Sequence, residues 1–283
     1  MRNIIFTFII SLNFVSTKAQ DLPRLDPMAT IEQRVGLTWI TLNHARPAVR
    51  ARKIWGTLIP YDHPWQIGTH EPTIIIFDDD VIINNHHVER GQYTLYVIPG
   101  KDTFRFILNS NTVQWRTFEY NKNTNVLEFD VNPTPSNFKE HLQFSFKDFS
   151  KNTAQICLEW EKLELCFEVE TEIKEKALKN IEEAIRFSQP DDYMVYLIAV
   201  NYAIETGEYL AKAENWANDA VKISNNAWDA LWLRANLYAK NNDFLHAVKF
   251  GEKCLAAIPS KDNKLELIDS YTTIIQKWKK HKK

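Results

Sequence analysis

The side chains best suited to chemistry are concentrated between positions 44 and 72, in HARPAVRARKIWGTLIPYDHPWQIGTHEP. The stretch has little periodicity, so it predicts an irregular segment and neither a helix nor a strand. Loops that carry arginines and large aromatic residues together are often binding surfaces or covers over the edge of a sheet. Our candidate ligand-binding residues in this stretch are Arg46, Arg52, Tyr61, Trp65, His70 and Glu71.

A metal site in this stretch would have suitable residue types but unsuitable spacing. The potential ligands are His44, Asp62, His63, His70 and Glu71. None of them is arranged as His-x-His on a strand or as His-x-x-x-His on a helix. The pair His86-His87 follows Asn84-Asn85, which indicates a solvated hairpin tip. We expect no metal at either place.

Motifs for nucleophilic catalysis and for cofactors are absent from the sequence. It has no G-x-S-x-G, and with 7 glycines in 283 residues it has no phosphate-binding loop. We therefore expect no cofactor. One enzymatic alternative stays open, a hydrolase or carbohydrate-binding module. In it, Trp65 and Tyr61 would stack on sugar faces, while His70 and Glu71 would act as acid and base.

The first 19 residues predict a signal peptide. Arg2 supplies a positive start, Ile4–Val15 is a short apolar run, and Thr17-x-Ala19 resembles a cleavage site. The run is short for a membrane span, and no later segment replaces it. We expect an exported protein, periplasmic or secreted, without a membrane span. A net charge of −2 argues against nucleic acid as a partner.

The period of the hydrophobic pattern divides the rest of the chain in two. Between about 29 and 169, short segments rich in β-branched and aromatic residues alternate with period two, which predicts an antiparallel β-sandwich of jelly-roll-like type over 21–170. From Thr171 the apolar residues recur at helical spacing. We place a helical domain at 171–283.

The helical part repeats. Ala213-x6-Ala220 recurs as Ala247-x6-Cys254, 34 residues later, and Ala199-x2-Tyr202 recurs as Ala235-x2-Tyr238. Small residues at these positions let antiparallel helices approach closely, so the pattern resembles tetratricopeptide-like α-α hairpin repeats. Arg234, Ala217 and Gly251 depart from the usual residue types. An unrelated bundle of α-hairpins remains the alternative.

Helical repeats of this type present the first helix of each hairpin to a concave surface. The polar residues expected there are Asn201, Glu205, Arg234 and Asn236. They are our candidate contacts to a protein or peptide partner. With only two full repeats, the helices could instead brace the β domain.

Two of the three cysteines lie in a predicted hairpin, AQICLEWEKLELCFEVE. A turn at Glu161-Lys162 places Cys157 directly opposite Cys166, close enough for a cross-strand disulfide. A looser loop would slide the register and separate them. Cys254 lies in a helical pattern and is expected to be a small buried residue.

An ordered set of short motifs in the β part resembles an exported bacterial family known as domain of unknown function 2911, over about residues 24–169. The motifs are Leu25-x-Pro27, Arg46-Pro47, Arg52-Lys53-Ile54-x-Gly56, Leu58-x-Pro60-Tyr61, Trp65-x-x-Gly68-x-x-Glu71, Gly91-x-Tyr93-x-Leu95-x-x-Ile98-Pro99-Gly100 and Leu158-Glu159-Trp160. Where members often carry Trp-Arg-x-Gly-Ala-Asn-Glu, this chain has Gln66 and His70 in place of the arginine and asparagine. The resemblance implies no reaction. We therefore expect a non-enzymatic exported protein whose helices bind a partner and whose β domain is a ligand-binding module.

Overall fold

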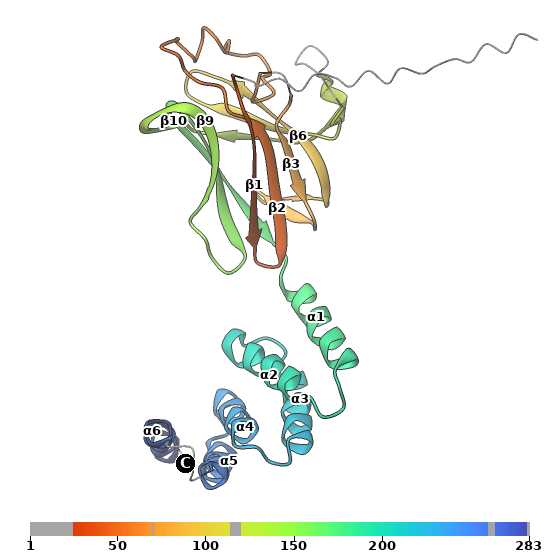
Figure 1. Ribbon diagram of the computed structural model, residues 1–283, viewed down its shortest axis with the longest axis vertical. Coiled ribbons are helices and arrows are strands. Elements are labelled where there is room, and N and C mark those ends of the chain that lie inside the picture. The colour runs from red at the N-terminus through yellow and green to blue at the C-terminus, as the bar shows by residue number, and fades with distance from the viewer. Residues whose placement is uncertain (1–24, 70, 114–119, 260–263, 282–283) are drawn as a thin grey trace, which may run out of the picture. The chain divides into compact units, whose positions relative to one another are not determined.

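The computed structural model describes residues 25–69, 71–113, 120–259 and 264–281. The chain forms two compact units, with the boundary between Thr171 and Glu172. The first contains antiparallel sheets, and in the described residues the second contains six helices (Figure 1). The prediction of a β part followed by an α part is confirmed. The expected signal peptide, residues 1–19, lies outside the described residues.

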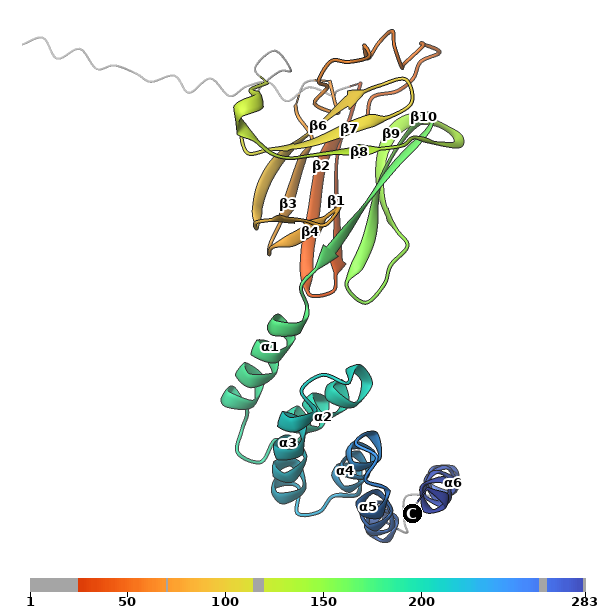
Figure 2. The ribbon, with the colours of Figure 1, turned by 180° about the vertical axis from the view of Figure 1, so that it is seen from behind.

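The β unit contains two antiparallel sheets. The six-stranded sheet has the order β1-β2-β3-β6-β7-β8 and the four-stranded sheet has the order β5-β4-β10-β9; Figure 2 shows β6, β7 and β8 side by side. The strands are β1 (Met28–Val35), β2 (Thr38–Ala45), β3 (Ile74–Phe77), β4 (Val81–Ile83), β5 (His86–Val88), β6 (Gly91–Pro99), β7 (Phe104–Asn109), β8 (Asn125–Val131), β9 (Thr134–Lys147) and β10 (Thr153–Thr171).

The alternating pattern of the strands produces a single core. In β2, Ile40 and Leu42 are fully buried, whereas Trp39, the residue before Ile40, is 44% exposed. This is expected because successive side chains of a strand point to opposite faces of the sheet. Buried side chains from both sheets belong to the same hydrophobic cluster. Phe106 of β7 contacts Phe167 of β10, with ring centroids 5.3 Å apart. The two sheets therefore share one core.

The segment β10 doubles back on itself. An extended strand would separate Cys157 from Cys166 by about 30 Å, but their Cα atoms are 4.1 Å apart and the two residues form a disulfide. The ends also meet, because Thr171 N–H donates to the carbonyl of Asn152 at 2.8 Å. Both pairs are centred on Glu161-Lys162, where Glu161 has a φ of 57°. The register is the one expected from counting outward from that turn.

Two further features of the β unit are a long strand and a tight turn. The long strand is β9, which covers Thr134–Lys147. The tip at Asn84-Asn85 is a tight turn with both residues at positive φ. The exposed pair His86-His87 follows it on the short strand β5, and His87 pairs with Asp80 at 3.0 Å.

The helical unit is built from helices of similar length. They are α1 (Lys174–Phe187), α2 (Met194–Thr206), α3 (Leu210–Ile223), α4 (Trp228–Lys240), α5 (Phe244–Ala257) and α6 (Leu265–Lys280). The starts of α2 and α4 are 34 residues apart (228 − 194), as are those of α3 and α5 (244 − 210). None of the helices in the described residues is long and apolar enough to cross a membrane.

The small residues of the repeating pattern are all inside the helical unit. Ala213, Ala220, Ala247 and Cys254 are 0% exposed. A missing side chain also allows α6 to dock on α5. A Cβ atom on Gly251 would lie 2.8 Å from Ile275 Cγ1 and 3.4 Å from Trp278 Cζ3, both on α6. Close approach of the helices therefore depends on these positions.

The disulfide closes a short loop, so its removal should cost about 2 kcal/mol of unfolding free energy. We expect this loss for the double variant Cys157→Ser, Cys166→Ser in chemical denaturation. A reductant should increase the intact mass by two hydrogen atoms and destabilise the wild type without affecting the variant. An unchanged mass after reduction would rule out the disulfide.

Enlarging a buried small residue should disrupt helix packing. We expect Ala213→Leu to lower the stability of the helical unit by about 1–3 kcal/mol, because overpacking shifts neighbouring helices. Ala211→Leu is the matched control, since Ala211 is exposed on the same helix. Equal unfolding curves for the two variants would contradict the packing described above.

Candidate functional site

The segment from 44 to 72 is tied to β6 through its backbone. Trp65 and Val97 exchange two hydrogen bonds of 2.8 Å, and Asp62 N–H donates to the carbonyl of Pro99 at 2.8 Å. Further along, Val49 N–H donates to the carbonyl of Glu140 on β9 at 2.7 Å. The segment is thus irregular, as its lack of period predicts, and fixed to strands of both sheets.

The tryptophans of this segment lie in the core. Trp65 is 7% exposed and stacks on Trp160 with ring centroids 5.5 Å apart. Trp55 packs edge-on against both of these rings at 5.9 Å. The faces of Trp65 are therefore covered by protein. The hypothesis that Trp65 stacks on a sugar is wrong, because stacking needs an accessible ring face.

The arginine candidates of the segment donate hydrogen bonds to its own backbone and to β9. Arg52 donates to the carbonyls of Val49 at 3.0 Å and Ala48 at 2.6 Å. Arg46 Nε donates to the carbonyl of Leu142 at 3.3 Å. An irregular segment leaves carbonyls without strand partners, and these guanidinium groups satisfy several of them. Both arginines thus have structural partners.

The remaining candidates of the segment are also placed by packing or lie outside the described residues. Tyr61 is half-buried and covers Gly56, where a Cβ atom would lie 2.4 Å from its ring. Gly56 has a φ of 76°, so the turn under this ring favours glycine. Glu71 is half-buried. His70 lies outside the described residues. The aromatic residues of the segment pack against the core and against the segment's own turn, and this arrangement does not indicate a reaction.

Among the described residues, the possible metal ligands of this segment do not form a cluster. His44 is buried, and His63 is exposed with its ring bonded to the carbonyl of Tyr61 at 2.8 Å. Within the described part of the chain, one group of three potential ligands lies within 4.8 Å of one another: Cys157, Glu164 and Cys166. Its two sulfur atoms are joined in the disulfide.

His44 is a buried, neutral side chain of the core. It is 1% exposed, neither ring nitrogen has a hydrogen-bond partner among the described residues, and the ring meets Phe144 edge-on at 5.0 Å. Burial first, and then the charge of Arg46, lower the pKa of His44 from 6.5 to about 4. The imidazole therefore stays uncharged in the folded protein down to mildly acidic pH.

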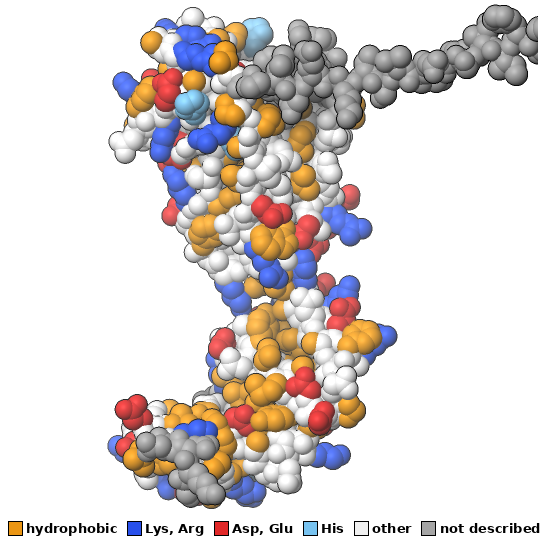
Figure 3. Space-filling view, viewed as in Figure 1, with side chains coloured by type: hydrophobic (Ala, Val, Ile, Leu, Met, Phe, Trp, Pro, Cys, Tyr) orange, Lys and Arg blue, Asp and Glu red, His pale blue; other side chains and the backbone are white. Residues whose placement is uncertain are grey.

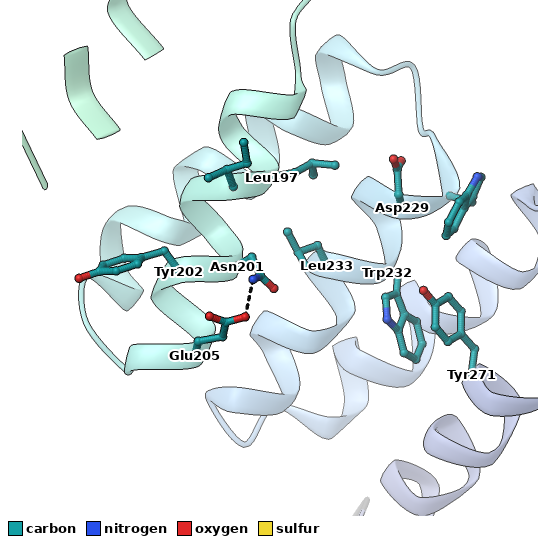
Figure 4. A pocket seen from close by; sticks show the side chains of 10 residues that line it. Leu197, Asn201, Tyr202, Glu205, Asp229, Trp232, Leu233 and Tyr271 are labelled. Atoms are coloured by element: carbon teal, nitrogen blue, oxygen red, sulfur yellow. Dashed lines mark hydrogen bonds between the residues drawn. The ribbon is translucent and has the colours of Figure 1, made fainter. Parts of the chain in front are cut away.

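The helical unit contains a groove that is open to solvent, unlike the packed aromatic residues of the segment from 44 to 72. It encloses about 540 Å³ and lies over α2, α4 and α6 (Figure 4). Trp232 of α4 and Tyr271 of α6 form one wall and stack with ring centroids 3.5 Å apart. The lining residues are Leu197, Ile198, Asn201, Tyr202, Glu205, Trp228, Asp229, Trp232, Leu233 and Tyr271.

The groove is apolar in the middle and acidic toward its two ends. Leu197 and Leu233 lie between Glu205 on α2 and Asp229 on α4 (Figure 4). Asn201 Nδ2 donates to Glu205 Oε1 at 2.6 Å, and Tyr193 Oη donates to Asp229 Oδ2 at 3.2 Å. Both carboxylates are thus oriented by neighbouring side chains.

Two of the four predicted partner contacts line the groove. Asn201 and Glu205 do, whereas Arg234 and Asn236 are not among its lining residues. Arg234 lies over the ring of Phe250 on α5 at 4.3 Å, on another face of α4. Arg234 remains a predicted partner contact outside this groove, and its long side chain packs against the second helix of its own hairpin. Asn236 donates to the carbonyl of Trp232 at 2.9 Å.

Eight of the ten lining residues were not among the predicted contacts, and four of these are Trp228, Asp229, Trp232 and Tyr271. The signal was present, because residues four apart share a helix face and the tryptophans at 228 and 232 therefore mark one aromatic stripe. That stripe cannot be assigned to the groove or to the core from spacing alone. In the structure both rings are half-buried.

The lowered pKa of His44 predicts a loss of stability in mild acid. His44 binds a proton near pH 6.5 in the unfolded chain but only near pH 4 in the folded protein. Its contribution to stability is therefore complete above pH 6.5 and is lost as the pH falls toward 4. Between about pH 7 and about pH 5 we expect His44 to account for a loss of about 2 kcal/mol. Denaturation curves of His44→Leu should lack this component. His63→Gln, an exposed histidine in the same segment, should retain it; identical pH profiles of wild type and His44→Leu would contradict the assignment.

Comparison with known proteins identifies a family for the β unit. The family model described as Protein of unknown function (DUF2911) matches residues 26–169. Those residues contain all ten strands except the last two residues of β10. No curated protein and no solved structure matches the chain. The chain belongs to the DUF2911 family of proteins of unknown function.

Proposed function

We propose that the protein binds a segment of another protein in the groove over α2, α4 and α6, without catalysing a reaction. One observation carries the proposal: an apolar groove of about 540 Å³ is walled by the stacked pair Trp232 and Tyr271. Tryptophan and tyrosine are enriched among the residues that dominate binding energy at protein interfaces. Ile198, at 65% exposed, extends the apolar surface to solvent.

We further propose that the helices are tetratricopeptide-like repeats and that the two sheets form a β-sandwich. The 34-residue spacing of helix starts and the buried Ala213 and Ala247 support the first assignment. In such repeats the first helix of each hairpin lines the concave face, and α2 and α4 hold that position here. The shared core of the two sheets supports the second assignment.

We also propose that the protein is exported to the periplasm or secreted. The charge and hydrophobicity of residues 1–19 support this proposal. The disulfide between Cys157 and Cys166 supports it independently, because disulfides persist in oxidising compartments.

The hydrolase or carbohydrate-binding alternative has lost its main support. It needed accessible aromatic faces in the segment from 44 to 72, and Trp65 is covered by Trp160 and Trp55. We therefore place ligand recognition in the helical unit.

Selection of peptides from a random displayed library on the purified protein tests the proposed function. Enriched peptides should bind the wild type and lose at least about tenfold in affinity, or 1.4 kcal/mol, on Ile198→Arg. This exposed substitution introduces a charge into the groove without removing core packing. Leu245→Arg is the matched control, because Leu245 is 54% exposed on α5 and is not a lining residue of the groove. Binding that survives Ile198→Arg unchanged would refute the groove as the site.

A further inference from the structure

We propose that the groove recognises a segment of another protein in which basic side chains flank an apolar side chain. This inference rests on the proposed function and adds the chemical nature of the partner. Its basis is the arrangement of charged and aromatic groups among the ten lining residues.

The groove carries acidic groups and no basic ones among its lining residues. Glu205 and Asp229 are its carboxylates, and none of the ten residues is lysine, arginine or histidine. The whole chain has nearly balanced charges, with 34 basic and 36 acidic side chains. The acidity is therefore a local property of this surface. On the face drawn in Figure 3, hydrophobic side chains gather on the helical unit with single acidic side chains among them.

The two carboxylates lie on different helices and can contact two different side chains of a partner. Glu205 belongs to α2 and Asp229 to the first turn of α4, at opposite ends of the apolar floor made by Leu197 and Leu233 (Figure 4). An apolar side chain on this floor would leave its neighbours along the segment near the carboxylates. A basic–apolar–basic pattern satisfies the floor and both ends together.

Trp228, which lies beside the aromatic wall of Trp232 and Tyr271, already contacts one ammonium group. Lys264 Nζ lies 4.4 Å above the ring of Trp228, which is a cation–π contact. Trp228 is also within 6.5 Å of Tyr271, measured between ring centroids. The same wall can therefore receive a lysine or arginine from a partner. The negative charge of Asp229 is also felt along it, because burial, then Cys254 and Asp229, raise the pKa of Tyr271.

The test uses three sets of labelled synthetic peptides with the same apolar residues, flanked by lysine, glutamine or glutamate. Fluorescence anisotropy should give an affinity for the lysine set about tenfold higher than for the glutamine set, and no binding of the glutamate set. High salt should reduce the difference, since exposed ion pairs are screened. Glu205→Gln combined with Asp229→Asn should reduce the preference to about twofold and leave the glutamine set unaffected. These substitutions keep acceptor oxygens for Asn201 and Tyr193.

Glu252→Gln serves as the control, since Glu252 pairs with Lys279 at 2.8 Å and does not line the groove. It should keep the full preference for lysine. Equal affinities of the lysine and glutamine sets, both lost on Ile198→Arg, would overturn the basic pattern and leave the proposed function intact. Binding of no set, or binding insensitive to Ile198→Arg, would overturn both. A dimer that forms through the groove, detected as a mass that falls to the monomer on Ile198→Arg, would identify a second copy as the occupant and overturn the proposal.

Discussion

The contact of α6 with Gly251 is the constraint on which the helical groove depends. Gly251 has no side chain, and the space is taken by Ile275 and Trp278 of α6. Because α6 lies this close to α5, Tyr271 reaches Trp232 of α4 and stacks on it. A larger residue at 251 would move α6 outward and separate the two aromatic rings. Tyr271, Ile275 and Trp278 lie on the same face of α6, so the packing at Gly251 and the aromatic wall of the groove depend on each other.

Hydrogen bonds and ring packing within the β unit account for the placement of Arg46, Arg52 and Trp65. Irregular backbone exposes carbonyl groups that strands would pair, and Arg52 donates to two of them, those of Ala48 and Val49, while Arg46 donates to Leu142 on β9. The tryptophans 55 and 65 fill the space above Trp160. Arginine and tryptophan together look like a binding surface in a sequence. Here the same types close one end of a core.

Sequence periodicity predicted the parts of the fold that depend on local geometry. The change of period located the boundary at Thr171, and counting outward from Glu161-Lys162 placed Cys157 opposite Cys166. The contacts between different elements were harder to predict from the sequence. β9 is longer than its hydrophobic pattern because β10 pairs with it beyond the alternating residues. Arg234 was assigned to the groove because helical spacing gives a face but does not say which neighbour covers it; Phe250, not solvent, lies under its guanidinium.

The two units differ in how the faces of some of their tryptophans are covered. In the β unit, Trp65 and Trp160 are 7% and 1% exposed, and neighbouring rings cover their faces. In the helical unit, Trp216 and Trp278 are also buried, at 8% and 9% exposed, whereas Trp228 and Trp232 are half-buried and line the groove. Half-buried indole rings beside carboxylates retain unfilled capacity for both apolar and cationic contacts.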